Sequence, residues 1–267
     1  MTQVALTIAG SDSGGSAGIQ ADLKTIAMHC VHGASAVTCI TAQNTIGVRE
    51  VAATNVALIA AQINAVVSDL RVDAVKTGML LNSEIMTAVA QQLRQHNLTK
   101  LVVDPVMVSR TGAQLIDDKA IASLKKLIIP QALIVTPNCY EAQILSGLTI
   151  SNLEELEQAA IAIWQNSGAK VVLAKGGGLS GAEQGTDVWY DGNETKIIFN
   201  KTVTTDNNSG TGCTLSAAIC ANLALGKSLW QSVLDAKSFV TSALEYSLAI
   251  GAGNGALGHF FPLLKSD

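Results

Sequence analysis

The segment Val4-Ala-Leu-Thr-Ile-Ala-Gly-Ser-Asp-Ser-Gly-Gly-Ser-Ala-Gly-Ile-Gln-Ala-Asp-Leu-Lys24 carries the pattern that decides the fold. It begins with a short apolar run, passes through a glycine-rich turn, and continues with apolar residues at three- and four-residue spacing. A strand, a tight connection and a helix in this order form the first half of a βαβ unit. We therefore predict a strand over residues 4–8 and a helix over residues 19–29.

The same alternation of strand and helix continues along most of the chain. The further predicted strands are 35–40, 74–77, 101–104, 133–136 and 171–174, and the predicted helices between them are 56–67, 84–96, 119–127, 140–145 and 153–166. This rhythm indicates an α/β fold with a doubly wound parallel sheet and right-handed crossovers.

The last third of the chain adds an edge and two helices. Asp191-Gly192-Asn193 separates the strand-like runs 188–190 and 196–199, which predicts an antiparallel hairpin at the edge of the sheet. Helices are expected over 213–225 and 229–248, followed by a glycine-rich loop over 251–258. Since neither a repeat nor a linker divides the sequence, we expect a single domain over residues 1–267.

Composition restricts the class of partner. The net charge of -4 gives no basic field for nucleic acid, and the apolar runs have strand length, so we expect a cytoplasmic protein without membrane or nucleic-acid partners. The five cysteines (30, 39, 139, 213 and 220) contain no Cys-x-x-Cys pair, which favours reduced thiols over disulfides or a zinc site.

The segment Asn207-Asn-Ser-Gly-Thr-Gly-Cys213 leads directly into an apolar helix and is a candidate phosphate site. Gly210 and Gly212 allow close approach of the backbone, and the N-terminus of a helix carries about half a unit of positive charge. The same charge predicts a lowered thiol pKa for Cys213, which makes this residue a candidate general base. The alternative is a small buried residue at a helix start.

Three further strand ends carry polar groups. Asp104 and Glu141 supply carboxylates that suit Mg²⁺ beside nucleotide phosphates, although each residue could instead cap the helix that follows it. Lys175 precedes three glycines, and its charge suits a transferring phosphoryl group, with a plain surface turn as the alternative.

The glycine-rich segment 10–18 predicts a substrate-facing loop, because ligands bind at the carboxyl ends of such strands. It matches neither the dinucleotide-binding nor the Walker A pattern. It does contain the Gly-x-Ser-x-Gly pattern of hydrolases at Ser16, for which Asp206 and His259 would have to complete a triad. We rank this alternative below a flexible turn.

Seven motifs together resemble one enzyme family. They are Gly10-Ser-Asp-Ser-Gly-Gly, Gly18-Ile-Gln-Ala-Asp-Leu-Lys24, Thr41-Ala-Gln-Asn-Thr45, Lys76-Thr-Gly-Met-Leu80, Asp104-Pro-Val-Met107, Lys175-Gly-Gly177 and Gly210-Thr-Gly-Cys-Thr-Leu-Ser216. In this order, over nearly the whole chain, they resemble the hydroxymethylpyrimidine/phosphomethylpyrimidine kinases of the ribokinase superfamily.

The resemblance implies a three-layer αβα ribokinase-like fold with a mostly parallel central sheet, ATP and Mg²⁺ as cofactors, and a homodimer. It also implies the reaction: phosphorylation of 4-amino-5-hydroxymethyl-2-methylpyrimidine, and then of its monophosphate to the diphosphate, in thiamine biosynthesis. The residues carried over are Gly10, Asp22, Gln43 and Met79 for the pyrimidine, Lys175, Gly210 and Thr211 for the nucleotide, Asp104 and Glu141 for the metal, and Cys213 with Lys175, Gly210 and Gly212 for catalysis.

The chain departs from the family's usual pattern on the phosphate side. Asn207-Asn208-Ser209 stands where Asn-Thr-His is usual, Gly178 occupies a position that is often histidine, and Gly251-Ala-Gly-Asn-Gly-Ala256 replaces a loop with histidine and proline. Two other functions therefore remain as alternatives. One is a pyridoxal kinase of the same subgroup, although Gln43 and Met79 favour the aminopyrimidine over pyridoxal as the substrate. The other is a catalytically silent ligand-binding protein.

Overall fold

The structure is a computed structural model that describes residues 2–107, 115–199 and 201–264. Within these residues, nine strands form one sheet in the order β3-β2-β1-β4-β5-β6-β7-β8-β9. The strands are β1 (Val4–Asp12), β2 (His32–Gln43), β3 (Val48–Ala53), β4 (Ala74–Thr77), β5 (Leu101–Val103), β6 (Ile134–Val135), β7 (Val172–Ala174), β8 (Asp187–Tyr190) and β9 (Thr195–Ile198). The six strands from β2 to β7 in this order are parallel, whereas β3, β8 and β9 pair antiparallel. The predicted α/β fold, mostly parallel sheet and edge hairpin are confirmed.

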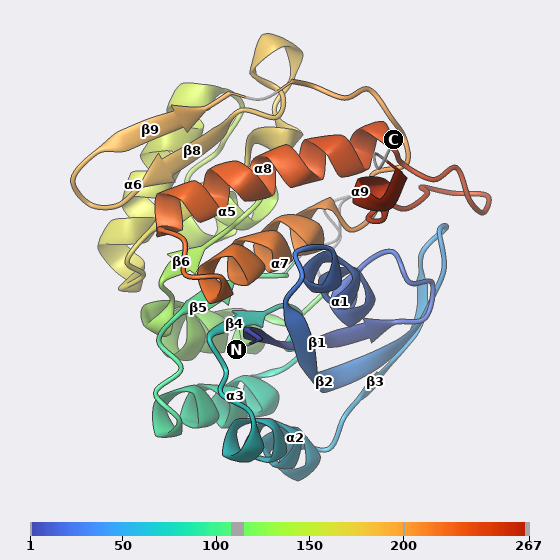
Figure 1. Cartoon of the computed structure of the whole chain (residues 1–267). Helices are drawn as coiled ribbons and strands as arrows, with labels where there is room; N and C mark the ends of the chain where they lie inside the picture. Colours follow the sequence, from blue (N-terminus) through green and yellow to red (C-terminus); the bar gives the residue numbers. More distant parts are fainter. Residues whose placement is uncertain (1, 108–114, 200, 265–267) are drawn as a thin grey trace.

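Helices cover both faces of the sheet, which gives three layers (Figure 1). They are α1 (Gly18–Met28), α2 (Val56–Asp69), α3 (Ser83–Gln95), α4 (Asp118–Ser123), α5 (Cys139–Ser146), α6 (Leu153–Ser167), α7 (Thr211–Ala224), α8 (Leu229–Glu245) and α9 (Phe261–Leu264). Successive residues of a strand point to opposite faces. Leu6 and Ile8 accordingly pack in the core beneath α2 to α6, while Ala5 packs in the core beneath α1, α7 and α8.

Three elements differ from the prediction, and one of them is the short helix α9, which was not predicted. The strand β3 was not predicted, because all of its residues are exposed and its sequence, Val48-Arg-Glu-Val-Ala-Ala53, has no alternating pattern; its pairing with β2 makes it a strand. The predicted helix over 119–127 is α-helical only to Ser123 and continues as a π-helix over Leu124–Ile128 and a 3-10 turn over Ile129–Gln131. Pro130 lacks a backbone N–H and cannot continue the α-helical pattern.

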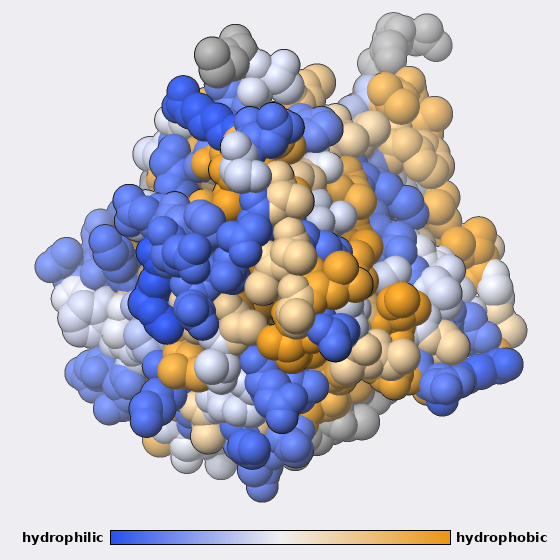
Figure 2. All heavy atoms as spheres, turned by 90° about the horizontal axis from the view of Figure 1, so that it is seen from below, coloured by the Kyte–Doolittle hydropathy of each residue, from blue (hydrophilic) through white to orange (hydrophobic). Residues whose placement is uncertain are grey.

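The remaining short turns lie after β7, as 3-10 segments over Gly176–Gly178 and Gly181–Glu183. No helix among the described residues is both long and apolar enough to cross a membrane. Figure 2 shows that one face of the molecule mixes hydrophilic regions with a band of apolar side chains. Apolar residues of the β2–β3 region are among those at the surface, including Ile40 (58% exposed) and Ile46 (71% exposed).

Candidate active site

The N-terminus of α7 forms the first part of the site. Gly210 precedes the helix with φ +87°, a left-handed conformation that favours glycine. A Cβ atom there would overlap the carbonyl oxygen of Ser16, so the loop after β1 lies directly against this helix start. Thr211 begins the helix, and its Oγ1 donates to the carbonyl oxygen of Asn208 at 2.6 Å. The predicted phosphate segment thus joins a helix N-terminus to a second glycine-rich loop.

Lys175 reaches this helix start from the end of β7. A Cβ atom on Gly212 would lie 3.2 Å from the Lys175 Nζ, which places the ammonium beside the first turn of α7. The same Nζ lies 3.3 Å from Asp104 Oδ1, and both side chains are largely buried. Burial alone would lower the pKa of Lys175, but the nearby Asp104 and Glu141 carboxylates raise it above its ordinary value. Lys175 therefore stays positively charged beside the N-terminus of α7.

Asp104 follows β5 and is held from two sides. Its Oδ1 faces Lys175, and its Oδ2 accepts a hydrogen bond from Ser216 Oγ of α7 at 3.2 Å. With only 3% of the residue exposed, this carboxylate is fixed between the sheet and α7. The prediction that these strand ends meet at one edge of the sheet agrees with this geometry.

Glu141 lies in the first turn of α5 and is 2% exposed. It forms a capping box: Glu141 Oε2 accepts from the Asn138 N–H at 2.9 Å, and Asn138 Oδ1 accepts from the Glu141 N–H at 3.0 Å. Burial raises the pKa of Glu141 to about 8, although the Lys175 charge opposes the shift. The helix-capping reading of Glu141 is therefore correct, and it places the carboxyl group within the field of Lys175.

The two carboxyl groups fit a cation that is shared with phosphates. Among the described residues, no cluster of three or more His, Cys, Asp or Glu side chains could enclose a metal ion. Mg²⁺ is commonly held by one or two carboxylates together with substrate phosphates and water. Asp104 and Glu141 offer that kind of donor set rather than a complete protein cage.

Cys213 does not have the predicted low pKa. The residue is only partly exposed, and burial raises the pKa of its thiol to about 11. The positive charge of Lys76 lowers the pKa, but burial outweighs it, and the negative charges of Asp104 and Asp22 raise the pKa further. The helix N-terminus was expected to lower this pKa, but the loss of hydration raises the pKa by more. That part of the prediction was wrong, and at neutral pH the residue is a thiol.

The raised pKa can be tested by alkylation. We expect iodoacetamide to modify Cys213 slowly at pH 7, at a rate that rises about tenfold with each pH unit up to pH 9, since only the thiolate reacts. Mass spectrometry of peptides measures the rate, with exposed Cys30 as an internal reference and Cys213→Ser to assign the signal. A rate that levels off near pH 7 would show a lowered pKa instead.

The predicted pyrimidine contacts lie on the other side of the loop after β1. A Cβ atom on Gly10 would lie 2.7 Å from Cys39 Sγ and 3.2 Å from Met79 Cε, so Gly10 and Met79 adjoin each other. Gln43 is half-buried at the end of β2, where its Oε1 accepts from Thr41 Oγ1 at 3.2 Å. Gly10 lies in β1, Gln43 ends β2 and Met79 follows β4, and these three strands are neighbours in the sheet.

Asp22 has a different environment from these three residues. It is 0% exposed, and both carboxylate oxygens lie 2.8 Å from Lys76 Nζ, while Thr7 Oγ1 donates to Oδ2 at 2.6 Å. Burial would lower the pKa of Lys76, but Asp22 more than offsets this effect, so the lysine stays charged. The sequence motifs predicted no role for Lys76, although a lysine in the otherwise uncharged strand Ala74–Thr77 was a visible signal.

The hydrolase alternative does not fit the geometry. Ser16 is 2% exposed, and its backbone N–H donates to Asp12 Oδ2 at 3.0 Å in the turn that packs against Gly210. His259 Nε2 lies 2.9 Å from Thr214 Oγ1, so it is engaged with α7, and Asp206 is exposed. These residues do not form a Ser-His-Asp arrangement.

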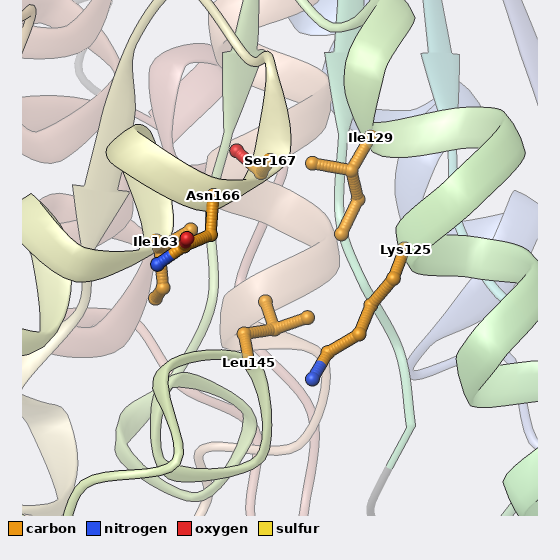
Figure 3. A pocket seen from close by; sticks show the side chains of 6 residues that line it. All are labelled: Lys125, Ile129, Leu145, Ile163, Asn166 and Ser167. Atoms are coloured by element: carbon orange, nitrogen blue, oxygen red, sulfur yellow. The ribbon is translucent and has the colours of Figure 1, made fainter.

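Two hollows lie in the described surface, and Gly14 and Gly15 of the loop after β1 line the larger one. A cavity of about 100 Å³ lies near the amino ends of β6 and β7, the opposite edge from the polar strand ends, and Figure 3 shows the side chains around it: Lys125, Ile129, Leu145, Ile163, Asn166 and Ser167. A larger, mostly apolar hollow of about 310 Å³ lies between α1 and the C-terminal residues 248–260. Neither hollow contains the charged groups described above.

Fold and site together define a class of protein. A mostly parallel sheet between two helical layers, with a lysine, two carboxyl groups and a glycine-flanked helix N-terminus at its carboxyl edge, is the arrangement of a ribokinase-like small-molecule kinase. The chain belongs to the phosphomethylpyrimidine kinase family, which it matches over residues 12–258. The resemblance noted in the motifs is therefore confirmed, and the protein is a phosphotransferase.

Individual relatives agree with this assignment. The chain is 53% identical over 260 residues to a hydroxymethylpyrimidine/phosphomethylpyrimidine kinase of Synechococcus elongatus, covering 97% of this chain and 98% of the relative. A crystal structure of phosphomethylpyrimidine kinase from Clostridium difficile has a TM-score of 0.81 at 41% identity and covers 91% of this chain and 100% of its own. An ADP complex of Bacillus subtilis pyridoxal kinase has a TM-score of 0.93 at 35% identity, covering 99% and 100%.

Proposed function

We propose that this enzyme uses ATP to phosphorylate 4-amino-5-hydroxymethyl-2-methylpyrimidine, and then its monophosphate to the diphosphate, for thiamine biosynthesis. The family assignment supports the substrate. The observation that carries the chemistry is the position of the Lys175 ammonium, 3.3 Å from Asp104 and beside Gly212 at the start of α7. A cation beside the N–H groups of a helix N-terminus suits a transferring phosphoryl group.

The two reactants approach from opposite sides of the loop after β1. On one side, Gly10, Gln43 and Met79 bind the pyrimidine ring, with the Asp22–Lys76 pair buried beneath them. On the other, Lys175, Gly210 and Thr211 bind the phosphates of ATP. The hydroxymethyl oxygen then attacks the γ-phosphorus in line, and ADP leaves.

Charge stabilisation is the main contribution of the protein. Lys175 neutralises equatorial oxygens of the γ-phosphoryl group, and the backbone N–H groups of residues 210–213 donate hydrogen bonds to the oxygens on which negative charge develops in the transition state. These groups are fixed in advance, since Lys175 is held by Asp104 and Gly210 by its packing on Ser16. Positioning therefore costs little reorganisation during the reaction.

Asp104 and Glu141 are the residues that would hold Mg²⁺, which would supply further neutralisation of the phosphate oxygens. Burial raises the pKa of Glu141, and a bound cation would oppose that shift, because it stabilises the ionised carboxylate.

The proton of the hydroxymethyl group leaves late in this mechanism. Phosphoryl transfer has a loose transition state, so the attacking oxygen needs little help from a base until the new bond is well formed. Cys213 lies in the first turn of α7, but its raised pKa of about 11 keeps it protonated at neutral pH, so the proton passes to an oxygen of the transferred phosphoryl group or to water. We therefore assign Cys213 a secondary role in the rate.

A direct assay tests the substrate. Purified protein is incubated with Mg-ATP and, separately, hydroxymethylpyrimidine, its monophosphate and pyridoxal, with and without EDTA, and mass spectrometry identifies the products. We expect the pyrimidine monophosphate and diphosphate, and no product with EDTA. Pyridoxal phosphate as the sole product would contradict the proposed substrate and favour a pyridoxal kinase, which the similarity to the B. subtilis structure also suggests. The absence of any product would favour a silent binding protein.

The proposal extends to the state of the protein in the cell. We expect one catalytic domain over residues 1–267, a cytoplasmic location and a homodimer. Exposed apolar side chains in the β2–β3 region, such as Ile40 and Ile46, support self-association because a second copy could cover them. Sedimentation velocity would measure the mass in solution.

A further inference from the structure

Asp12 is a buried carboxylate at the end of β1 and is 3% exposed. Its Oδ1 accepts a hydrogen bond from the Gly14 N–H at 2.8 Å, and its Oδ2 accepts from the N–H groups of Ser16 at 3.0 Å and Ala17 at 2.8 Å. Hydrogen bonds from amides to a carboxylate are stronger than those between neutral groups. Asp12 therefore fixes the course of the loop over residues 13–17.

This loop is bonded to the pyrimidine side of the site. Ser13 Oγ donates to the carbonyl oxygen of Gln43 at 2.8 Å and accepts from the Gln43 N–H at 2.8 Å. The backbone of Gln43, which carries a proposed pyrimidine contact, is thus tied to the loop. Movement of the loop would move the end of β2 with it.

The same loop is packed against the phosphate side. The carbonyl of Ser16 touches the Cα of Gly210 so closely that no Cβ fits between them. Gly210 is the residue before α7, and its carbonyl oxygen accepts from the Thr214 N–H at 2.8 Å within the first turn. The position of the loop therefore determines how the helix N-terminus lies relative to Gln43.

We propose that Asp12 is a positioning residue that holds the pyrimidine pocket and the phosphate-binding amides at a fixed relative position, so that the acceptor oxygen lies in line with the γ-phosphorus. The inference rests on the proposed function, since it takes Gln43 as a pyrimidine contact and residues 210–213 as phosphate contacts. A displacement of about 1 Å between reactants can cost roughly a hundredfold in rate.

Misalignment has a second consequence besides a lower rate. When the hydroxymethyl oxygen is out of line, a water molecule can attack the γ-phosphorus instead. The water oxygen forms the new bond, the bond from the γ-phosphorus to the bridging oxygen of ADP breaks, and phosphate, ADP and a proton leave. The ratio of ADP formed to phosphoryl groups transferred to the pyrimidine, with each diphosphate counted as two, is one when no ATP is hydrolysed and therefore reports alignment directly.

Asp12→Asn tests this role, because the amide keeps the size of the side chain but leaves one oxygen where two had accepted three hydrogen bonds. We expect kcat to fall roughly a hundredfold and the ratio of ADP to transferred phosphoryl groups to rise clearly above one. Asp191→Asn is the matched control: Asp191 accepts from the N–H groups of Asn193 at 3.0 Å and Glu194 at 3.1 Å in the loop between β8 and β9. It should keep the wild-type kcat and ratio.

A purely structural role for Asp12 would lower the melting temperature and leave kcat per folded molecule and the ADP ratio unchanged, and that result overturns the inference. If Asp12→Asn does not fold, Ser13→Ala takes its place. Ser13 is exposed, and its change removes both hydrogen bonds to Gln43 without touching those of Asp12. We expect a higher KM for the pyrimidine and a ratio above one, and wild-type values would refute the proposal.

The wild-type protein separates this inference from the proposed function. If it phosphorylates the pyrimidine with a ratio near one and the Asp12 and Ser13 variants do the same, only the role of Asp12 is wrong. If the wild type forms no pyrimidine phosphate, the proposed function is wrong and the inference fails with it.

Discussion

Replacing Lys175 by methionine is expected to lower kcat about a hundred- to a thousandfold, the usual loss when a preorganised charge stabiliser is removed. The ammonium lies 3.3 Å from Asp104 and beside the first turn of α7, where the phosphoryl group would be transferred. Its loss would leave the equatorial oxygens without the side-chain charge that neutralises them. The KM for the pyrimidine should change little, because Gly10, Gln43 and Met79 remain in place. Steady-state kinetics with both substrates measures the effect.

The control for this variant is Lys227→Met, which removes an ion pair with Asp235 of 2.6 Å at the surface. It should keep the wild-type kcat. Cys213→Ala offers a comparison within the site, and we expect it to be milder than Lys175→Met, since a loose transition state demands little of a base. Our mechanism would be contradicted if loss of the thiol reduced kcat far more than loss of the ammonium.

Lys76→Met is expected to have the largest effect on stability, lowering the free energy of unfolding by about 3–5 kcal/mol. The side chains of Lys76 and Asp22 are both 0% exposed and form an ion pair of 2.8 Å. Removing the ammonium leaves the Asp22 carboxylate buried with Thr7 as its remaining hydrogen-bond donor among those described above. Urea unfolding followed by circular dichroism measures the change.

Two further variants show whether the unpaired charge is the cause. The double variant Lys76→Met with Asp22→Leu should be more stable than Lys76→Met alone, because no charge is then left unpaired. Lys227→Met, at the exposed pair with Asp235, should cost about 0–1 kcal/mol. Equal losses in the buried and exposed single variants would show that the Asp22–Lys76 pair contributes no more than a surface contact.

Much of the site could be located from the sequence because parallel strands place their carboxyl ends at one edge of a sheet. Asp104 and Lys175 each follow a predicted strand, and the structure brings them within 3.3 Å although 71 residues separate them. The roles of these residues remain predictions until the variants are measured. The glycine-rich segments also predicted where α1 and α7 begin, because glycines before an apolar helical pattern can be recognised in the sequence.

Other features of the site could not be predicted. The helix start at Cys213 suggested a low thiol pKa, but desolvation, together with carboxylates from β5 and α1, raises it to about 11. β3 has no sequence pattern of its own and depends on β2 as a partner. Asp12 appeared as one polar residue in a flexible turn, yet its carboxylate accepts three backbone amides.

The sequence alone determined the alternation of strands and helices, the mostly parallel sheet and the family, because these depend on residue spacing and on motifs that lie close together along the chain. The tertiary structure alone decided which charges are paired and which groups are cut off from water. The Lys76–Asp22 pair joins residues 54 positions apart, and the field at Cys213 comes from β4, β5 and α1. Hydration and electrostatic interaction depend on distance in space, so the protonation states that govern the chemistry follow from packing.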